Sequence, residues 1–180
     1  ITPVGQSVAE LWEAAKSGRS GVRRITAFDA SDLATQIAAE VRDFDPVARF
    51  GRREARRMDR FIQFAVAAAQ DAVVDAGLEI TQENADRVAI IIGSGVGGMA
   101  TLLFIPMMLT DSAAGQVAIS LGARGPNMAV VSACASSANA IGEAGEVIRR
   151  GSADVVICGG TEAAILPLAI AAFNVMGALS

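Results

Sequence analysis

The sequence of 180 residues contains no histidine and only two cysteines, Cys134 and Cys158. Two cysteines cannot build a disulfide framework, and without histidine they do not complete a plausible zinc site. A free thiol suits a reducing compartment, so we expect a cytoplasmic protein, or an organelle enzyme whose transit peptide has been removed. Aromatic residues make up only 4% of the chain, whereas glycines number 18. The core should therefore consist of small and aliphatic side chains, with backbones in close approach at glycines.

Long apolar runs and an excess of positive charge are absent as well. No uninterrupted apolar stretch reaches the ~18 residues of a membrane span, and Ile1 opens no signal segment. The net charge of −4 argues against a general nucleic-acid binder. We therefore expect neither a membrane nor a nucleic acid as a partner. Because 52% of the residues are hydrophobic, the chain can bury a sizeable core as one domain or a large part of one.

Hydrophobic periodicity predicts strands that alternate with helices. Short buried strands are expected at 87–92, 128–132 and 154–158, with helices between them at 111–121 and 135–150. This alternation predicts an α/β layer structure with right-handed crossovers.

Two further helices and one short strand are expected in the first part of the chain. A capping box at 7–10 begins a helix of about three turns that ends before Gly18. The longest helix is expected over 52–76, where apolar residues recur at spacings of three and four until Gly77. Residues 21–50 show no strong period apart from a short strand at 36–41.

Cys134 lies where strand-forming residues give way to small helix formers. A cysteine at a helix start faces unpaired N–H groups and the positive end of the peptide dipoles, which favours the thiolate. The same amides can hold an oxyanion formed on a bound carbonyl. The residues alone leave two interpretations open, an activated nucleophile or a small buried core residue. Cys158, inside a strand pattern, is expected to be structural and inert.

The segment Gly93–Gly98 satisfies the pattern Gly-x-Gly-x-x-Gly directly after an expected strand. Taken alone, this pattern suggests a dinucleotide site. Pro106 lies in the helix that would have to aim its N-terminus at a pyrophosphate, so we favour a tight glycine turn instead. Glu162, after the glycine pair at 159–160, is expected to be a hydrogen-bonded scaffold residue rather than an acid catalyst.

Several motifs in a fixed order carry a family resemblance: 1–5, 57–63, 75–78, 93–98, 104–108, 125–127, 132–142 and 157–163. Together they resemble the β-ketoacyl-[acyl-carrier-protein] synthases, specifically the elongating type II enzymes of fatty-acid synthesis. The resemblance implies a thiolase-like fold with α-β-α layers and a buried helix. Residues 1–180 would form its N-terminal half-domain, an incomplete one that lacks the first strand and one loop between Met99 and Phe104.

The resemblance also implies roles for individual residues. Cys134 would be the catalytic nucleophile, and Val96, Phe104 and Phe173 would contribute to substrate binding. Val96 would shape the acyl pocket, Phe104 would lie near a homodimer interface, and Phe173 would lie near the cysteine. No cofactor is implied.

Arginines crowd residues 49–60, and four of them recur at helical spacing and should form a basic stripe: Arg53, Arg56, Arg57 and Arg60. The residues alone fit a docking surface for an acidic partner or a solvated face partly neutralised by Glu54 and Asp59. In ketosynthases, basic residues that match Arg53, Arg56 and Arg57 meet the acidic acyl carrier protein. The resemblance therefore favours docking.

The reaction implied is a decarboxylative Claisen condensation of an acyl thioester with malonyl-acyl carrier protein through a covalent acyl-cysteine. In the resembled family, two histidines from the second half supply hydrogen-bond donors for the decarboxylation, with a lysine nearby. Because this chain has no histidine, we expect that alone it can at most be acylated. Alternatives are a noncatalytic ketosynthase-like subunit or interaction module, and a polyketide synthase ketosynthase. An enzyme that condenses coenzyme A thioesters is disfavoured by the motif at 57–63.

Overall fold

The computed structural model describes residues 1–101 and 105–179, which divide into two compact units. The larger unit comprises Val47–Ala163, and the smaller unit comprises Ile1–Pro46 and Ala164–Ser180. From Pro46 to Gly160 the elements are α2 (Pro46–Ala55), α3 (Arg60–Asp75), β3 (Val88–Gly93), α4 (Ile105–Met108), α5 (Ser112–Leu121), β4 (Asn127–Val130), α6 (Ser136–Arg149) and β5 (Val155–Gly160), together with short 3₁₀ turns.

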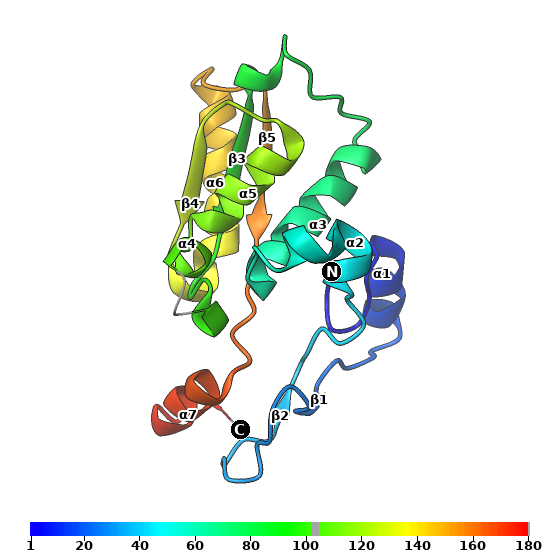
Figure 1. Ribbon diagram of the computed structural model, residues 1–180, viewed down its shortest axis with the longest axis vertical. Helices are drawn as coiled ribbons and strands as arrows, with labels where there is room; N and C mark the ends of the chain where they lie inside the picture. The colour runs from blue at the N-terminus through cyan, green and yellow to red at the C-terminus, as the bar shows by residue number, and fades with distance from the viewer. Residues whose placement is uncertain (102–104, 180) are drawn as a thin grey trace. The chain divides into compact units, whose positions relative to one another are not determined.

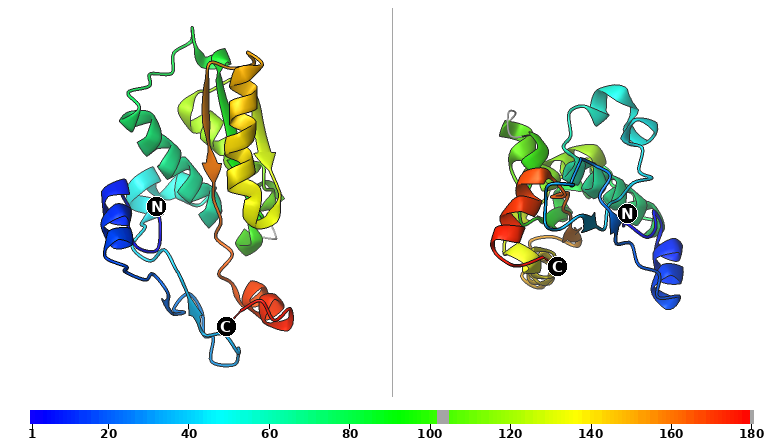
Figure 2. Two further views of the ribbon diagram at one scale, coloured as in Figure 1. Left: turned by 180° about the vertical axis from the view of Figure 1, so that it is seen from behind. Right: turned by 90° about the horizontal axis from the view of Figure 1, so that it is seen from below.

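The larger unit is built around a parallel three-stranded sheet in the order β4-β3-β5 (Figure 1). All six residues of the central strand β3 are buried, because helices cover both of its faces. Ile90 and Ile92 pack with α3 and α5 in one core cluster, whereas Ala89 and Ile91 pack with α6 in another. Figure 2 shows α6 lying along the sheet. The expected α-β-α layers are therefore confirmed.

The strands and helices expected around the sheet are confirmed to within a few residues. The central strand β3 is a fully buried run of Val, Ala, Ile and Gly, as expected for a strand inside a parallel sheet, whereas β4 and β5 are only partly buried. Helix α6 ends where Gly151 adopts a left-handed φ of 72°, and the Gly151 N–H donates to the Ile148 carbonyl. Glycine has no Cβ and takes this conformation without strain, so the sequence predicts the end of α6 correctly.

The helix expected over 52–76 is found as α3, which at 16 residues is the longest among the described elements, but its expected start is wrong, because residues 52–55 belong to α2. Helix α2 is itself kinked at Gly51, which has a φ of 78°. Asp59 has extended dihedral angles and accepts a hydrogen bond from the Phe61 N–H at 3.3 Å, so it is the N-cap of α3. A capped helix start competes with continuation through the same residues, and apolar spacing alone does not reveal that competition.

The smaller unit contains α1 (Val8–Lys16), β1 (Arg23–Arg24), β2 (Ile37–Ala38) and α7 (Pro167–Val175). The capping box is confirmed, since Ser7 accepts from the Glu10 N–H and the Glu10 carboxylate accepts from the Ser7 N–H. The expected short strand is present as β2, paired with β1 in an antiparallel ribbon. Across the described ranges of both units, no helix is long and apolar enough to cross a membrane.

Candidate active site at the carboxyl end of the sheet

Cys134 is exposed and lies in a 3₁₀ turn, Ala133–Ala135, that joins β4 to α6. The helix start expected at 135 is shifted by one residue, since α6 begins at Ser136. The sulfur is therefore neither in mid-strand nor within the core. Among the described residues, no hydrogen-bond acceptor is found for the Cys134 backbone N–H, which leaves this donor available to a bound carbonyl.

The turn that carries Cys134 is strained and firmly held. Ala133 has a φ of 52°, a left-handed conformation that costs a residue with a Cβ about 1–2 kcal/mol. The Ser136 hydroxyl accepts from the Ser132 N–H at 2.9 Å and donates to the Ala133 carbonyl at 2.8 Å. The Asn139 amide donates to the Ser132 hydroxyl at 2.7 Å. These bonds hold a conformation that the isolated segment would not favour.

Two glycines let the N-terminus of α6 rest directly on the sheet. A Cβ added to Gly93, at the end of β3, would lie 2.3 Å from the Ser136 carbonyl oxygen. A Cβ added to Gly160, at the end of β5, would lie 2.4 Å from the Ser137 Cβ. The Cys134 turn is therefore placed at the carboxyl ends of parallel strands, where open α/β sheets bind their ligands.

The glycine segment after β3 forms a loop beside this turn. The Gly95 and Val96 N–H groups both donate to the Glu162 Oε2, at 2.9 and 3.0 Å. The amides that would cradle a phosphate are thus occupied by a carboxylate of the same chain. The glycine segment bends, with Gly97 at a left-handed φ of 73°, and Glu162 is hydrogen-bonded, as expected.

The residues expected to bind substrate do not all lie in the same unit of the structure. Val96 is 37% exposed, and its loop neighbours the cysteine turn, since a Cβ on Gly95 would lie 3.4 Å from the Ala133 carbonyl oxygen. Phe104 lies outside the described residues. Phe173 lies on α7 in the smaller unit and is 41% exposed. Within the larger unit, the structure therefore places the loop that carries Val96 beside the turn that carries Cys134.

The arginines do not form a stripe on one helix, so that geometry was wrong. Arg52 and Arg53 lie in the last turn of α2, Arg56 and Arg57 lie in the turn after it, and Arg60 begins α3. The first four are exposed. We call Arg52, Arg53, Arg56 and Arg57 the arginine turn.

The acidic neighbours neutralise this turn only in part. The Glu54 Oε1 lies 3.9 Å from the Arg53 Nε and 3.7 Å from the Arg57 Nη1. Asp59 is 3% exposed and caps α3. Arg60 differs from the others, since its guanidinium lies 4.9 Å from the centroid of the Phe64 ring and burial lowers its pKa.

Cys158 lies in β5 with its side chain half-buried. Burial raises the pKa of its thiol above the ordinary value, because the apolar surroundings disfavour the thiolate. The expectation that this cysteine is structural agrees with that environment.

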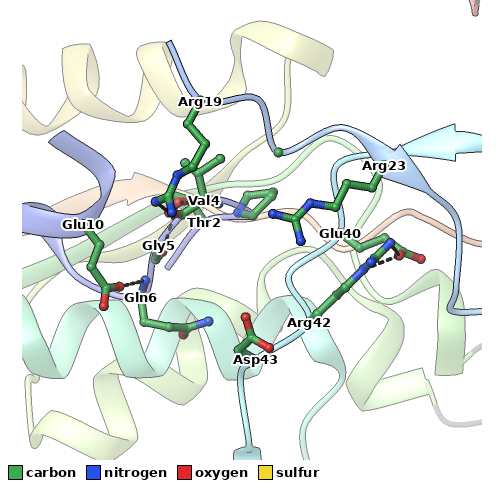
Figure 3. Close-up of a pocket in the computed structure, with 12 residues that line it drawn as sticks. Thr2, Val4, Gly5, Gln6, Glu10, Arg19, Arg23, Glu40, Arg42 and Asp43 are labelled. Atoms are coloured by element: carbon green, nitrogen blue, oxygen red, sulfur yellow. Dashed lines mark hydrogen bonds and ion pairs between the residues drawn. The ribbon is translucent and has the colours of Figure 1, made fainter. Parts of the chain in front are cut away.

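The smaller unit contains a polar cavity of about 310 Å³ that the sequence did not indicate (Figure 3). Arg19, Arg23 and Arg42 line it together with acidic side chains, and Arg42 forms an ion pair with Glu40 at 2.8 Å. Burial disfavours the charge of Glu40, but hydrogen bonds from Ala27, Thr26 and Arg42 outweigh it and hold the pKa of Glu40 below its usual value. No cluster suited to a metal ion occurs in the part of the chain that the structure describes.

Two features of the site were not foreseen. The left-handed Ala133 carries no sequence signal, because alanine is not a residue that favours this conformation. The pairing of Glu162 with the amides of residues 95 and 96 joins positions 66 and 67 residues apart. A glycine-rich loop without a helix behind it was the one available hint that its N–H groups need an internal acceptor.

Comparison with known proteins identifies the family. The family model described as "Beta-ketoacyl synthase, N-terminal domain" matches residues 1–180. The chain is 45% identical to 3-oxoacyl-[acyl-carrier-protein] synthase 2 of Synechocystis sp. and 44% identical to that of Staphylococcus aureus. Each alignment covers all of this chain but only 47% and 49% of the relatives. Each also spans 197 positions, 17 more than the 180 residues, so both relatives carry residues that this chain lacks.

Solved structures agree with the sequence relatives. The ishigamide ketosynthase/chain length factor superposes with a TM-score of 0.89 at 30% identity, and a β-ketoacyl synthase from Burkholderia phymatum with 0.81 at 28%. Both cover all of this chain, which spans 49% and 48% of their lengths. These likenesses confirm the expected thiolase-like fold. The chain spans about half the length of the curated relatives it matches. Because the model of the N-terminal domain matches residues 1–180, the chain belongs to the β-ketoacyl synthase family.

Proposed function

We propose that this chain is the acyl-accepting N-terminal half-domain of a β-ketoacyl-[acyl-carrier-protein] synthase that elongates fatty acids. The single observation that carries the proposal is an exposed cysteine on a strained turn at the carboxyl end of the sheet. The curated relatives bear the name of this activity, which supports its assignment to the protein that contains this chain.

In the first step, the thiolate of Cys134 attacks the carbonyl carbon of an acyl thioester. A new C–S bond forms to Cys134, and the old C–S bond breaks when the carrier thiolate leaves, so that an acyl-cysteine remains. Negative charge develops on the carbonyl oxygen, and the Cys134 N–H is a donor for it.

In the second step, a malonyl thioester loses carbon dioxide, and its α-carbon displaces Cys134 from the acyl group. The resulting enolate-like oxygen needs hydrogen-bond donors. The family resemblance assigns these donors to two histidines of the second half, and this chain contains no histidine. The contribution of these 180 residues is therefore to accept, hold and present the acyl group.

The arginine turn provides the docking surface for an acyl carrier protein. Arg53, Arg56 and Arg57 are exposed, and the turn lies at the end of the sheet that also carries Cys134. The Thr161 hydroxyl, just after β5, donates to the Phe61 carbonyl in the first turn of α3 at 2.6 Å, which fixes this location. Val96, whose loop adjoins the Cys134 turn, shapes the acyl site.

Acyl transfer tests the proposal. The product of the full reading frame that contains this chain is incubated with acyl-acyl carrier protein, and the adduct is located by peptide mapping. Acylation confined to Cys134, retained in Cys158→Ala and lost in Cys134→Ala, is the expected result. Carrier binding without acylation at any thiol would contradict the proposal and support a noncatalytic interaction module.

A further inference from the structure

We propose that Glu162 is a positioning residue that fixes the loop 94–97, and with it Val96, beside the Cys134 turn. The inference rests on the proposed function, because it assigns Glu162 a part in shaping the acyl site. Neither the reaction scheme nor the family resemblance gives this carboxylate a role.

One carboxylate oxygen gathers the loop. Glu162 Oε2 accepts from the N–H groups of the consecutive residues Gly95 and Val96 and lies 3.5 Å from the Ser94 hydroxyl oxygen. The Gly97 N–H in turn donates to the Ser94 hydroxyl at 3.1 Å, and Ser94 is only 2% exposed. Consecutive amides that converge on one point form an anion-binding nest, and hydrogen bonds to an ionised acceptor are the strong ones.

The backbone that carries Glu162 is itself anchored on two sides. The preceding residue, Thr161, donates its N–H to the Gly93 carbonyl at 2.9 Å and its hydroxyl to the Phe61 carbonyl at 2.6 Å. The carboxylate therefore extends from a fixed point where β3, β5 and α3 meet. A loop tied to this point inherits its position.

Gly95 lies close to both Glu162 and the cysteine turn. A Cβ on Gly95 would lie 3.4 Å from Glu162 Oε2 and 3.4 Å from the Ala133 carbonyl oxygen. Ala133 directly precedes Cys134 and holds the strained dihedral angles of the turn. Movement of the loop would therefore change both the place of Val96 and the packing against the turn that presents the thiol.

Replacing the carboxylate separates positioning from charge. Glu162→Ala removes the carboxylate that accepts from the Gly95 and Val96 N–H groups, so the loop loses its hydrogen bonds to the segment that follows β5. Glu162→Gln keeps a side-chain carbonyl oxygen that can accept from the same two groups. Glu143→Ala is the matched control, because Glu143 is a surface carboxylate on α6 that pairs with Arg150 at 2.7 Å.

The experiment measures amide hydrogen exchange of a peptide covering 94–97 and the rate of acyl transfer to Cys134, both in the product of the full reading frame. For Glu162→Ala we expect protection of the Gly95 and Val96 amides to fall about tenfold or more. Acyl transfer should slow by roughly tenfold to a hundredfold and change its dependence on acyl chain length. Glu162→Gln should retain most of the protection and rate, and Glu143→Ala should match the wild type.

Unchanged exchange and acyl transfer in Glu162→Ala would overturn the inference. Equal slowing of Glu162→Ala and Glu162→Gln with protection retained would also overturn it, since the carboxylate would then act by its charge. Failure of the proposed function gives a different result, because the wild-type protein itself would then take up no acyl group. The exchange measurement still decides whether Glu162 fixes the loop in that case.

Discussion

At the scale of single residues, the two thiols of this chain lie in different surroundings. Cys134 is exposed on a turn, whereas Cys158 is half-buried within a strand between other strand residues. Burial raises the pKa of Cys158, so its reactive thiolate form is scarce at neutral pH. The position of Cys158 within a strand therefore makes its thiol a packing group rather than a reactive one.

Cys158 should make stability fall at alkaline pH. Its pKa is raised in the folded state, so this group's stabilising contribution is fully present below the ordinary thiol pKa of ~8.5. The contribution is lost as the pH rises through the folded pKa, because the unfolded chain ionises first. Urea unfolding at pH 7.5 and pH 10 should therefore show a larger loss in the wild type than in Cys158→Ala. The chain holds no histidine or tyrosine to obscure this comparison, and equal losses would contradict it.

At the scale of elements, sequence patterns predicted the features that depend on a few adjacent residues, and they missed the point where a new helix start competes with continuation of the helix before it. The strands of the sheet and the capping box before α1 follow from a few adjacent residues, and both are found. The run 52–76 reads as one helix, yet Asp59 caps a new one, because its carboxylate binds the Phe61 N–H. Spacing of apolar residues describes the face of a helix and does not describe where the helix begins.

The glycine at the end of β3 should prove essential for placing the cysteine turn. In Gly93→Ala, the added methyl group would meet the Ser136 carbonyl oxygen at 2.3 Å, and neither backbone can move without disturbing the sheet or α6. We expect a loss of about 1–3 kcal/mol in the free energy of unfolding, measured by urea denaturation. Alkylation of Cys134 by iodoacetamide should also change its rate, since Ser136 holds the turn.

Gly115→Ala provides the control for this substitution. Gly115 lies inside α5, and a Cβ there would meet nothing within 4 Å. Alanine should therefore stabilise the helix by about 0.5–1 kcal/mol and leave the alkylation rate unchanged. A Gly93→Ala protein as stable as Gly115→Ala would show that α6 does not rest on β3 as described.

At the scale of the whole molecule, the charge is unevenly distributed. The chain carries a net charge of −4, yet the arginine turn gathers four exposed guanidinium groups, and among the described residues Glu54 forms ion pairs with two of them. Local fields act on a partner whatever the total charge, within a distance that salt limits. The sequence predicted this concentration of arginines correctly and its arrangement wrongly, because the arrangement depends on the break at Asp59.

The arginine turn should govern the affinity for an acyl carrier protein and leave the chemical step unchanged. Exposed ion pairs each contribute about 0.2–1 kcal/mol, so combined replacement of Arg53, Arg56 and Arg57 by alanine should raise the KM for the carrier roughly tenfold. The kcat should stay the same, because none of the three side chains belongs to the Cys134 turn. Acyl-transfer kinetics with varied carrier concentration measure both constants.

Salt and a distant arginine distinguish docking from general destabilisation. The difference in KM should shrink between 50 and 300 mM salt, because the Debye length falls below about 10 Å above ~0.1 M. Arg124→Ala is the control. The Arg124 Nε lies 2.8 Å from a carboxylate oxygen of Asp86, which lies just before β3 at the end of the sheet opposite to Cys134. The KM of this variant should equal that of the wild type. If Arg124→Ala weakens carrier binding as much as the triple replacement does, the carrier responds to overall charge and the arginine turn is not its docking surface.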